Sequence, residues 1–529
     1  MIHLSLIPWM AMAQTAASGP LLGVLAHRTA HDHTTIAYGG GLLLLASAFG
    51  NGLNYVFGIF LARTLGSDDF GLYALAITLF NILTLGAVFG MDTGAIKFVS
   101  HHLVGGQLRK AAVTLVAAAS MVFGSGLLVA LGLVSLAPSL AVVYGKPEVV
   151  SSCRLLAASI PFATVTAVLL SALQAFQTVR YTILVKYLWE PIAKFLLAAI
   201  LIWFGFHLYG VLLSIVLTLV VSAALLTRIA RRLVAQGFHD RPEWDAHEAS
   251  TLLAYCLPLS VSNVFGVIAP RADLLILGYW VNTQDVGIYL AAFQTAAIMA
   301  LVLSAFDTGL APILSRAWSL HDRIRMGESY QAVARLSITV SFPIFCCLIL
   351  FSSEVLSMFG PEFAKGSTAL VFLACGQIFN NATGSANTVL LMSGHSRIVM
   401  MNTMLMGAVL LGTTATAIPL WGMNGAAVAA STTFILTNMM RVVQVWRLHQ
   451  VQPYTWDLAK PVAAAAFAST IVLLLKQSSF WIPGTMLVAI LGMIYVVALW
   501  LMGISRQDRI LLEALASRGK SLLERRPEA

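Results

Sequence analysis

The chain has 529 residues, of which 59% are hydrophobic and only 10% are charged, and its mean hydropathy is +0.86. This composition excludes a soluble globular protein, because uncharged apolar runs recur from residue 39 to residue 505. Most runs reach the roughly 20 residues that a helix needs to cross a bilayer core. The runs are continuous rather than alternating, which favours spanning helices over a closed barrel. The predicted fold class is an all-α polytopic membrane protein.

Counting the apolar runs predicts about fourteen transmembrane helices. The longest run, 398–440, is divided at "PLWGMNG", where Pro419, Gly422 and Gly425 predict a turn. The predicted spans are 39–62, 70–91, 111–136, 155–176, 181–205, 208–227, 251–280, 286–306, 336–355, 367–391, 398–418, 424–443, 461–476 and 485–503.

The net charge of +9 follows the membrane topology and requires no nucleic-acid partner. Of the 31 Lys and Arg residues, 23 lie in segments on the same side as the N-terminus, Arg441 being counted among them, and five lie on the opposite side. The remaining three, Lys186, Lys194 and Arg271, fall inside spans. By the positive-inside rule, both termini are predicted to be cytoplasmic.

A repeat divides most of the chain into two similar halves. "LGSDDFGLYALA" at 65–76 reappears as "VNTQDVGIYLAA" at 281–292 with an offset of 216 residues, and "MDTGA" reappears as "FDTGL" with an offset of 215. "QAFQTVR" has its counterpart in "LLMSGHSR" at an offset of 217. With six spans each, both halves enter the membrane from the same side, which predicts two lobes related by an axis along the membrane normal.

The predicted organisation therefore has six parts. These are a cytoplasmic N-terminal extension at 1–38, an N-lobe at 39–228, a cytoplasmic linker at 229–250, a C-lobe at 251–447, two further spans within 448–505 and a basic cytoplasmic tail at 506–529. We expect the N-terminal extension to be uncleaved, because no basic region precedes its apolar start.

Metal, redox and catalytic motifs are missing from the sequence. The five cysteines lie within or beside apolar runs without a Cys-x-x-Cys pair, so they are predicted to pack as small hydrophobic residues. The clusters "HRTAHDH" and "SHH" lack a closed set of zinc ligands and are predicted to be solvated. There is no phosphate-binding G-x-x-x-x-G-K-[ST] loop and no large carboxylate-rich loop. We expect no cofactor, no metal and no enzyme activity.

Several segments resemble one known family. "RTLGSDDFGLYALA", "GMDTGAIKFVSHH", "YGKPE" and "ALQAFQTVRYTILVKYLWEPIAKFLL" are similar, in their order, to the polysaccharide-biosynthesis branch of the multidrug/oligosaccharidyl-lipid/polysaccharide exporter superfamily. The resemblance covers residues 39 to 505. It implies a flippase that moves an undecaprenyl-diphosphate-linked oligosaccharide across the bacterial inner membrane by alternating access. It also implies a V-shaped cavity in which Lys186, Lys194 and Arg271 meet the diphosphate.

Lys186, Glu190 and Lys194 are spaced four residues apart and therefore share one helical face. Counted from Arg180 at about 1.5 Å per residue, they lie roughly 9, 15 and 21 Å into the bilayer. Two interpretations remain open. Glu190 could neutralise both lysines in a structural ion triad, or the lysines could form a ladder for a diphosphate with Glu190 tuning them. Pro191 on the same face predicts a kink.

Two further ionisable residues, Arg271 and Asp273, lie inside a predicted span. They are two residues apart and point to different faces of a helix, so we expect Asp273 to meet a neighbouring helix and Arg271 to contact phosphate. Glu190 and Asp273 are candidates for carrying a coupling ion, which would be a proton or sodium. Polar groups expected to line a glycan cavity are Asn263, Gln294, Asn380 and Asn381.

Five charged residues near span ends are predicted to have gating or structural roles. Asp92 and Asp307 occupy equivalent places in the repeat and are followed by Lys97 and Arg316, so each Asp could cap a helix, pair with a base or contact substrate. Arg63 on the opposite side is either a helix-end anchor or part of an outer gate.

The sequence thus favours a lipid-linked oligosaccharide flippase, with the lipid, the glycan and glycan polymerase or ligase machinery as expected partners. The alternatives are a lipid II flippase, a cation-coupled multidrug exporter and a membrane scaffold without transport activity. An exporter of cationic drugs would need an acidic cavity, whereas the buried bases outnumber the buried acids.

Overall fold

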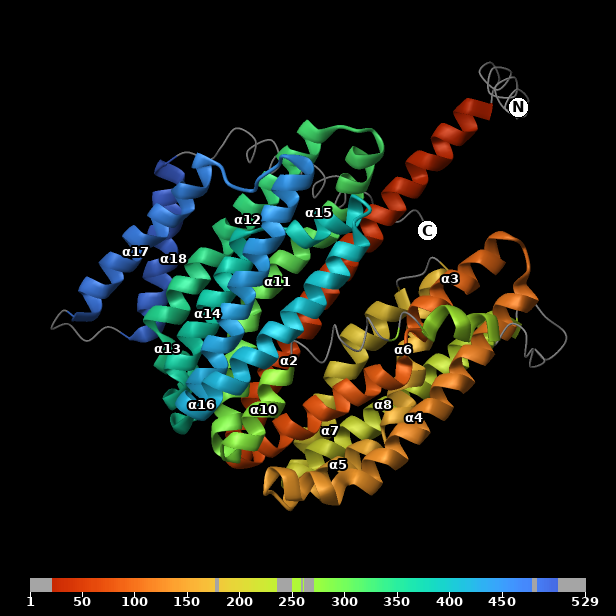
Figure 1. Cartoon of the computed structure of the whole chain (residues 1–529), viewed down its shortest axis with the longest axis horizontal. Coiled ribbons are helices and arrows are strands. Elements are labelled where there is room, and N and C mark those ends of the chain that lie inside the picture. Colours follow the sequence, from red (N-terminus) through yellow and green to blue (C-terminus); the bar gives the residue numbers. More distant parts are fainter. Residues whose placement is uncertain are drawn as a thin grey trace.

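The structure is a computed structural model that describes residues 21–176, 180–235, 250–257, 260, 271–477 and 483–502. All the regular elements in this part of the chain are helical. Figure 1 shows two bundles that meet near α10 and α5 and diverge toward α15 and α3. Segments of the chain that are far apart in sequence therefore meet at one end of the molecule.

The first half of the chain contains α2 (Leu21–Val88), α3 (Met91–Val104), α4 (Leu108–Tyr144), α5 (Glu148–Ala157), α6 (Ile160–Ala175), the π-helix η1 (Thr182–Trp189), α7 (Glu190–Trp203) and α8 (His207–Ala235). The second half contains α10 (Ala272–Trp280), α11 (Thr283–Ser319), α12 (Arg323–Leu350), α13 (Ser352–Ser357), η3 (Pro361–Gly366), α14 (Ser367–Ala382), α15 (Ala386–Met392), α16 (Ser396–His449), η4 (Trp456–Leu458), α17 (Ala459–Gln477) and α18 (Gly484–Leu501).

Within the described ranges, eight helices are long and apolar enough to cross a membrane, or nine if the bent pair α5 and α6 forms one span. Two of the eight are much longer than a bilayer requires. The segment Leu45–Val104 has 60 residues, about 90 Å of helix at 1.5 Å per residue, against a hydrocarbon core of about 30 Å. The protein is therefore multi-pass, and its longest helices must be bent.

The bends occur at glycines that adopt left-handed backbone angles. In α2 the helix breaks at Gly66 (φ 77°), and in α16 it breaks at Gly422 (φ 55°). Glycine adopts positive φ without the steric cost that a Cβ atom brings. The break at Gly422 confirms the turn predicted in "PLWGMNG". Each long helix thus consists of two limbs, which we call the first and second limbs of α2 and of α16.

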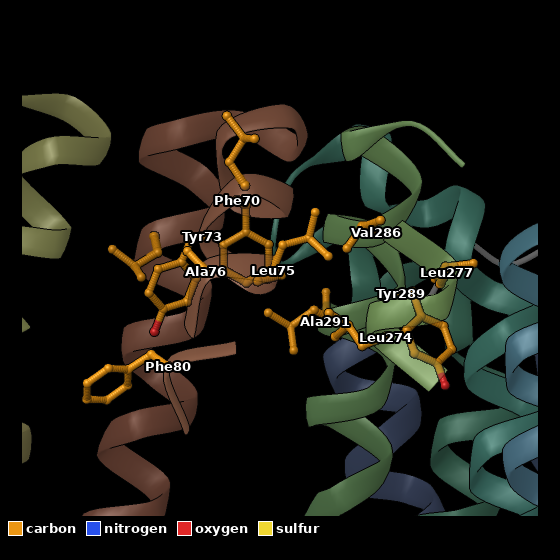
Figure 2. Packing of buried hydrophobic residues seen from close by; sticks show 14 of the residues in the cluster. Phe70, Tyr73, Leu75, Ala76, Phe80, Leu274, Leu277, Val286, Tyr289 and Ala291 are labelled. Carbon is orange, nitrogen blue, oxygen red and sulfur yellow. The ribbon is translucent and has the colours of Figure 1, made fainter. Parts of the chain in front are cut away.

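A single apolar cluster joins the two halves where the bundles meet. Figure 2 shows Phe70 and Leu75 from α2 on the side toward Leu274 of α10 and Ala291 of α11, with Tyr73 and Tyr289 flanking this contact on opposite sides. Phe70 and Tyr289 are fully buried, and the hydroxyl groups of the two tyrosines point outward on opposite sides. In a membrane such contacts stabilise through close packing rather than through water exclusion, so their fit decides their strength.

The tightest point of this contact is reciprocal between the repeated segments. A Cβ atom on Gly71 would overlap the carbonyl oxygen of Thr283, and one on Gly287 would overlap the carbonyl oxygen of Ser67. Both pairs are related by the offset of 216 residues. The glycines therefore let the backbones of α2 and α11 approach closely, as small residues do between membrane helices.

The C-terminal helices α17 and α18 pack on the outside of the second bundle. Their buried side chains share a core with Cys346 of α12 and Phe351, which follows it. Tyr495 donates a hydrogen bond to the carbonyl oxygen of Thr339 at 2.6 Å, and Lys476 forms an ion pair with Glu354 at 2.7 Å. This pair of helices thus contacts the second half of the chain.

We expect Gly71→Ala and Gly287→Ala each to lower the thermal unfolding midpoint of the protein in detergent micelles. The added methyl group would force the two backbones apart, and overpacking of this kind costs about 1–3 kcal/mol. The matched control is Gly124→Ala, because nothing lies within 4 Å of a Cβ atom at Gly124 in α4. Equal thermal unfolding midpoints for the three glycine-to-alanine variants would show that the close approach of α2 and α11 does not limit the stability of the protein.

Candidate functional site

The first limb of α2 lies between the two halves and contacts both. On one side, a Cβ atom at Gly50 would lie 2.8 Å from the carbonyl oxygen of Tyr187 in η1. On the other side, the Tyr55 hydroxyl lies 3.2 Å from the Thr295 hydroxyl in α11. This limb is therefore placed to respond to any movement of one bundle relative to the other.

Lys194 of α7 contacts this limb of α2 through its side chain. Its ammonium group donates a hydrogen bond to the Asn54 side-chain oxygen at 2.7 Å and lies 4.7 Å from the centre of the Phe57 ring. The ring faces attract cations, and this attraction grows where water is excluded. Phe195, the next residue in α7, packs against Phe57 with ring centres 5.8 Å apart. Both neutral contacts leave the charge of Lys194 uncancelled.

The three residues on the predicted face do not form a closed ion triad. Lys186 is exposed, whereas Glu190 and Lys194 are half-buried. Glu190 interacts electrostatically with both lysines, but among the described residues no ion pair shorter than 4.0 Å joins it to either one. One Glu190 oxygen is buried without a hydrogen-bond partner. We call Lys186, Glu190 and Lys194 the cationic face.

The backbone of the cationic face is irregular. Thr182–Trp189 forms a π-helix, and Pro191 follows in the first turn of α7. Proline lacks the backbone N–H that would continue the helical hydrogen bonds, and π-turns accommodate such interruptions, often at functional sites. The wide helical turn thus ends at Trp189, just before Glu190 and Pro191, and the kink at Pro191 stays a prediction.

The structure places Arg271 and Asp273 at the interface between the halves. Asp273 is only 2% exposed and accepts hydrogen bonds from the Tyr289 hydroxyl in α11 and from the backbone N–H of Leu274. Arg271 is half-buried just before α10 and interacts electrostatically with Tyr73 and Asp273. The carboxylate thus meets a neighbouring helix and helps to hold α10 against α11.

Polar contacts reinforce the end at which the bundles meet. Arg63 donates to the carbonyl oxygen of Met358 at 2.7 Å, and Lys146 donates to those of Gly278 and Val281 at 2.9 and 3.0 Å. Thr283 donates to the Asp68 carboxylate at 2.8 Å. The carbonyls at helix C-termini carry partial negative charge, which suits a cationic partner. Burial lowers the pKa of Lys146. We call this set the polar clasp.

The predicted gating residues near the diverging end have different partners. Asp92 lies in the first turn of α3, where a negative charge is stabilised by the helix dipole. Lys97 lies over the Tyr255 ring at 3.8 Å, so α3 contacts the helical residues 250–257. Asp307 accepts a hydrogen bond from Thr388 at 3.1 Å, and Arg316 is exposed at the end of α11.

Some sequence expectations need correction. Asn381 is fully buried and donates to Ser341 and to the carbonyl oxygen of Met299, so it packs within the second bundle instead of lining a cavity. His102 is 7% exposed, so the prediction that it is solvated was wrong. Gln294 and Asn380 are half-buried. Asn263 and the side chains of residues 27–33 lie outside the described part of the chain.

The described part of the chain contains no group of three metal-ligating side chains that could hold a metal ion. All five cysteines are free; Cys153, Cys256 and Cys346 are buried, and Cys347 and Cys375 are half-buried. This placement agrees with their predicted role in packing.

Two basic residues were not identified as site candidates from the sequence. Lys146 follows α4 in a polar loop and looks like an ordinary anchor, and only the structure brings it to α10. Arg441 was counted with the cytoplasmic charges, but α16 continues to His449, which places Arg441 two turns inside the helix. The sequence feature that could have indicated this position is the apolar stretch that continues beyond Arg441.

A family model described as "Polysaccharide biosynthesis protein" matches residues 60–365, which is more than half of the chain. The chain belongs to this family. It is 26% identical over 351 residues to the probable low-salt glycan biosynthesis flippase Agl15 of Haloferax volcanii, covering 64% of this chain and 68% of that protein. It is 25% identical over 352 residues to the succinoglycan biosynthesis transport protein ExoT of Rhizobium meliloti, covering 64% and 66%.

Solved structures share the fold. The lipid II flippase MurJ in an inward closed conformation matches with a TM-score of 0.66 at 15% identity, covering 88% of this chain and 99% of that chain. A multidrug resistance MATE family transporter of the MOP superfamily in an inward-facing conformation matches with a TM-score of 0.63 at 14% identity, covering 75% and 94%. The family consists of flippases and transporters rather than enzymes, which confirms the resemblance identified from the sequence.

We expect Lys146→Met to destabilise the polar clasp. The substitution removes two hydrogen bonds from a charged donor, each worth about 1.5–3 kcal/mol, so the thermal unfolding midpoint in micelles should fall. The matched control is Lys365→Met, because Lys365 is exposed in η3. An unchanged midpoint for Lys146→Met would mean that solvent replaces both hydrogen bonds.

Proposed function

We propose that this protein is a flippase that moves an undecaprenyl-diphosphate-linked oligosaccharide from the cytoplasmic to the outer leaflet of a bacterial inner membrane, for cell-surface polysaccharide biosynthesis. The observation that carries the proposal is the cationic face, where two lysines lie beside a helix that contacts both halves. Agl15 and ExoT, named for glycan biosynthesis and transport, support this assignment.

We further propose that the chain crosses the membrane fourteen times, with both termini cytoplasmic. In this count, α2 and α16 each contribute two spans, one for each limb. The pair α5 and α6 is counted as one span, and so is the pair α14 and α15. The segment that ends in α10 is counted as the seventh span. The diverging end then faces the cytoplasm, since Lys97, Arg316 and Arg447 lie there, as the positive-inside rule requires. The polar clasp lies at the outer surface.

In this topology the substrate enters between the bundles from the cytoplasm. An uncancelled ammonium group inside the membrane costs on the order of 3 kcal/mol, and a diphosphate that binds Lys186 and Lys194 removes that cost. Arg271 supplies a third cation near the interface of the halves. Outward opening requires the polar clasp to break, including the hydrogen bonds that Arg63 and Lys146 donate from the N-lobe. At the same time, new contacts form at the other end, near Asp92, Lys97, Asp307 and Arg316.

The coupling ion, if one is used, is best carried by Glu190. One of its oxygens is buried without a hydrogen-bond partner, so it can accept a proton or a sodium ion. Asp273 is the second candidate, but its two oxygens already accept hydrogen bonds from Tyr289 and Leu274. The membrane potential could also act directly on the anionic headgroup.

The main alternative is a lipid II flippase, which the fold similarity to MurJ favours. Both substrates present a lipid diphosphate to the cationic face, so the two proposals differ in the glycan only. Lysines at this position disfavour an exporter of cationic drugs, since like charges repel. Glycan polymerase or ligase machinery is a candidate partner downstream of translocation.

We expect Lys186→Ala/Lys194→Ala to reduce translocation of a fluorescent undecaprenyl-diphosphate oligosaccharide in proteoliposomes at least tenfold. The double variant loses both ammonium groups that would neutralise the diphosphate. The matched control is Lys365→Ala, which removes an exposed lysine at the other end of the molecule. Equal transport by the double variant would assign the lysines a structural role, and inactive wild-type protein would contradict the proposed substrate.

We expect Glu190→Gln to abolish the dependence of transport on a proton or sodium gradient. Glutamine keeps the shape of the side chain but cannot ionise. The measurement compares transport rates with and without each gradient in the same proteoliposomes, with Asp273→Asn as the second variant. A gradient dependence that survives in Glu190→Gln but is lost in Asp273→Asn would move the coupling role to Asp273.

A further inference from the structure

Arg441 lies in the candidate membrane span Ser396–His449, and it belongs, like Arg271, to the half that lacks the cationic face. It belongs to the second limb of α16, eight residues before the helix ends at His449. At about 1.5 Å per residue, this places it about 12 Å from that end. The residue is half-buried, so part of its side chain remains accessible.

The side chain lies toward the N-terminal end of its limb. Side chains on a helix tilt toward its N-terminal end, which for this limb is Gly422, away from His449. The Nη1 group of Arg441 donates to the Asn438 oxygen at 3.3 Å, and Asn438 lies one turn closer to Gly422. Arg441 therefore extends toward Gly422 and not toward the His449 end of the helix, the direction in which a snorkelling side chain would reach.

The guanidinium group is poorly satisfied by the protein. Of its five N–H donors, only one has a hydrogen-bond partner among the described residues, and its Nε atom is buried without one. No acidic side chain in the described part of the chain forms an ion pair with it. An arginine inside a membrane segment is costly, so an anionic partner from outside the protein would stabilise it.

Two amide side chains are linked to Arg441 by hydrogen bonds in a chain. Asn438 is 3% exposed and donates to the Asn380 side-chain oxygen in α14 at 3.0 Å. Asn438 thereby presents its oxygen to Arg441, and the amino group of Asn380 is left as a donor without a partner among the described residues. The guanidinium and this amino group are both donors, which is the requirement of an oxyanion.

We propose that Arg441, supported by Asn438 and Asn380, forms an oxyanion-binding site in the second half of the protein. This proposal rests on the proposed function, because a lipid-linked glycan supplies two kinds of oxyanion. One is the diphosphate of the lipid, and the other is the carboxylate of an acidic sugar. In either case the substrate is held by both halves, through the cationic face and through Arg441.

The test uses full-length protein purified in micelles, with inorganic pyrophosphate and tri-galacturonate as probes and maltotriose as the neutral control. Binding is followed by the rise of the thermal unfolding midpoint with probe concentration. We expect Arg441→Gln to need at least ten times more of one anionic probe than the wild type. The matched control is Arg447→Gln, since Arg447 is exposed near the end of the same helix. Arg441→Lys keeps the charge without the planar fork and replaces Arg441→Gln if that variant does not fold.

The outcome identifies the oxyanion. Weakened pyrophosphate binding assigns the lipid diphosphate to Arg441, and weakened galacturonate binding assigns an acidic sugar. If neither anion binds the wild type, or if Arg447→Gln is as impaired as Arg441→Gln, the proposal is overturned. Transport in proteoliposomes separates the two hypotheses. If Arg441→Gln changes neither transport nor anion binding, the Arg441 site alone is contradicted. If the wild type binds the anions but transports nothing, the flippase assignment alone is contradicted.

Discussion

The close approach of α2 to α11 is the constraint on which the rest of the structure depends. Gly71 and Gly287 allow each backbone to pack on the carbonyl group of the other half, and the apolar cluster and the polar clasp surround that point. Because the two contacts are related by the repeat, neither half can move there without affecting its counterpart. In the conformation that the structure shows, the bundles are joined at this end and diverge at the other (Figure 1).

The ionisable groups inside the membrane are arranged around that junction in different ways. Asp273 is satisfied by donors from its own surroundings, so it stabilises the junction at little electrostatic cost. Lys194 has an amide and an aromatic ring as partners, and Arg441 has one amide. Neutral partners position a cation without cancelling its charge, which leaves both cations able to attract an anion. The hydrogen-bonded carboxylate therefore differs from the two cations, whose charges stay available for the binding role that we propose.

The sequence predicted what depends on local pattern. Apolar length identified an all-helical multi-pass membrane protein, although eight or nine candidate spans are found in the described residues against the fourteen predicted. The turn at Gly422 followed from proline and glycine. It could not predict Asn54 as the partner of Lys194, because the two residues are 140 positions apart. It counted Arg441 among the cytoplasmic charges, although α16 continues for two turns beyond it. Asn381 could not be identified as buried because a polar residue in a span fits either a cavity or a hydrogen-bonded core.

The repeat accounts for the scaffold but not for the site. With the offset of 217 residues that relates "QAFQTVR" to "LLMSGHSR", Lys186, Glu190 and Lys194 correspond to Thr403, Gly407 and Leu411, none of which is charged. The second half carries Arg271 before α10 and Arg441 on the limb that follows these positions. Two similar bundles with different charges present different surfaces to one substrate, so an asymmetric molecule with an anionic headgroup at one end can bind in a fixed orientation. In the proposed mechanism, the symmetric packing allows the halves to move together, and the asymmetric charges orient the substrate.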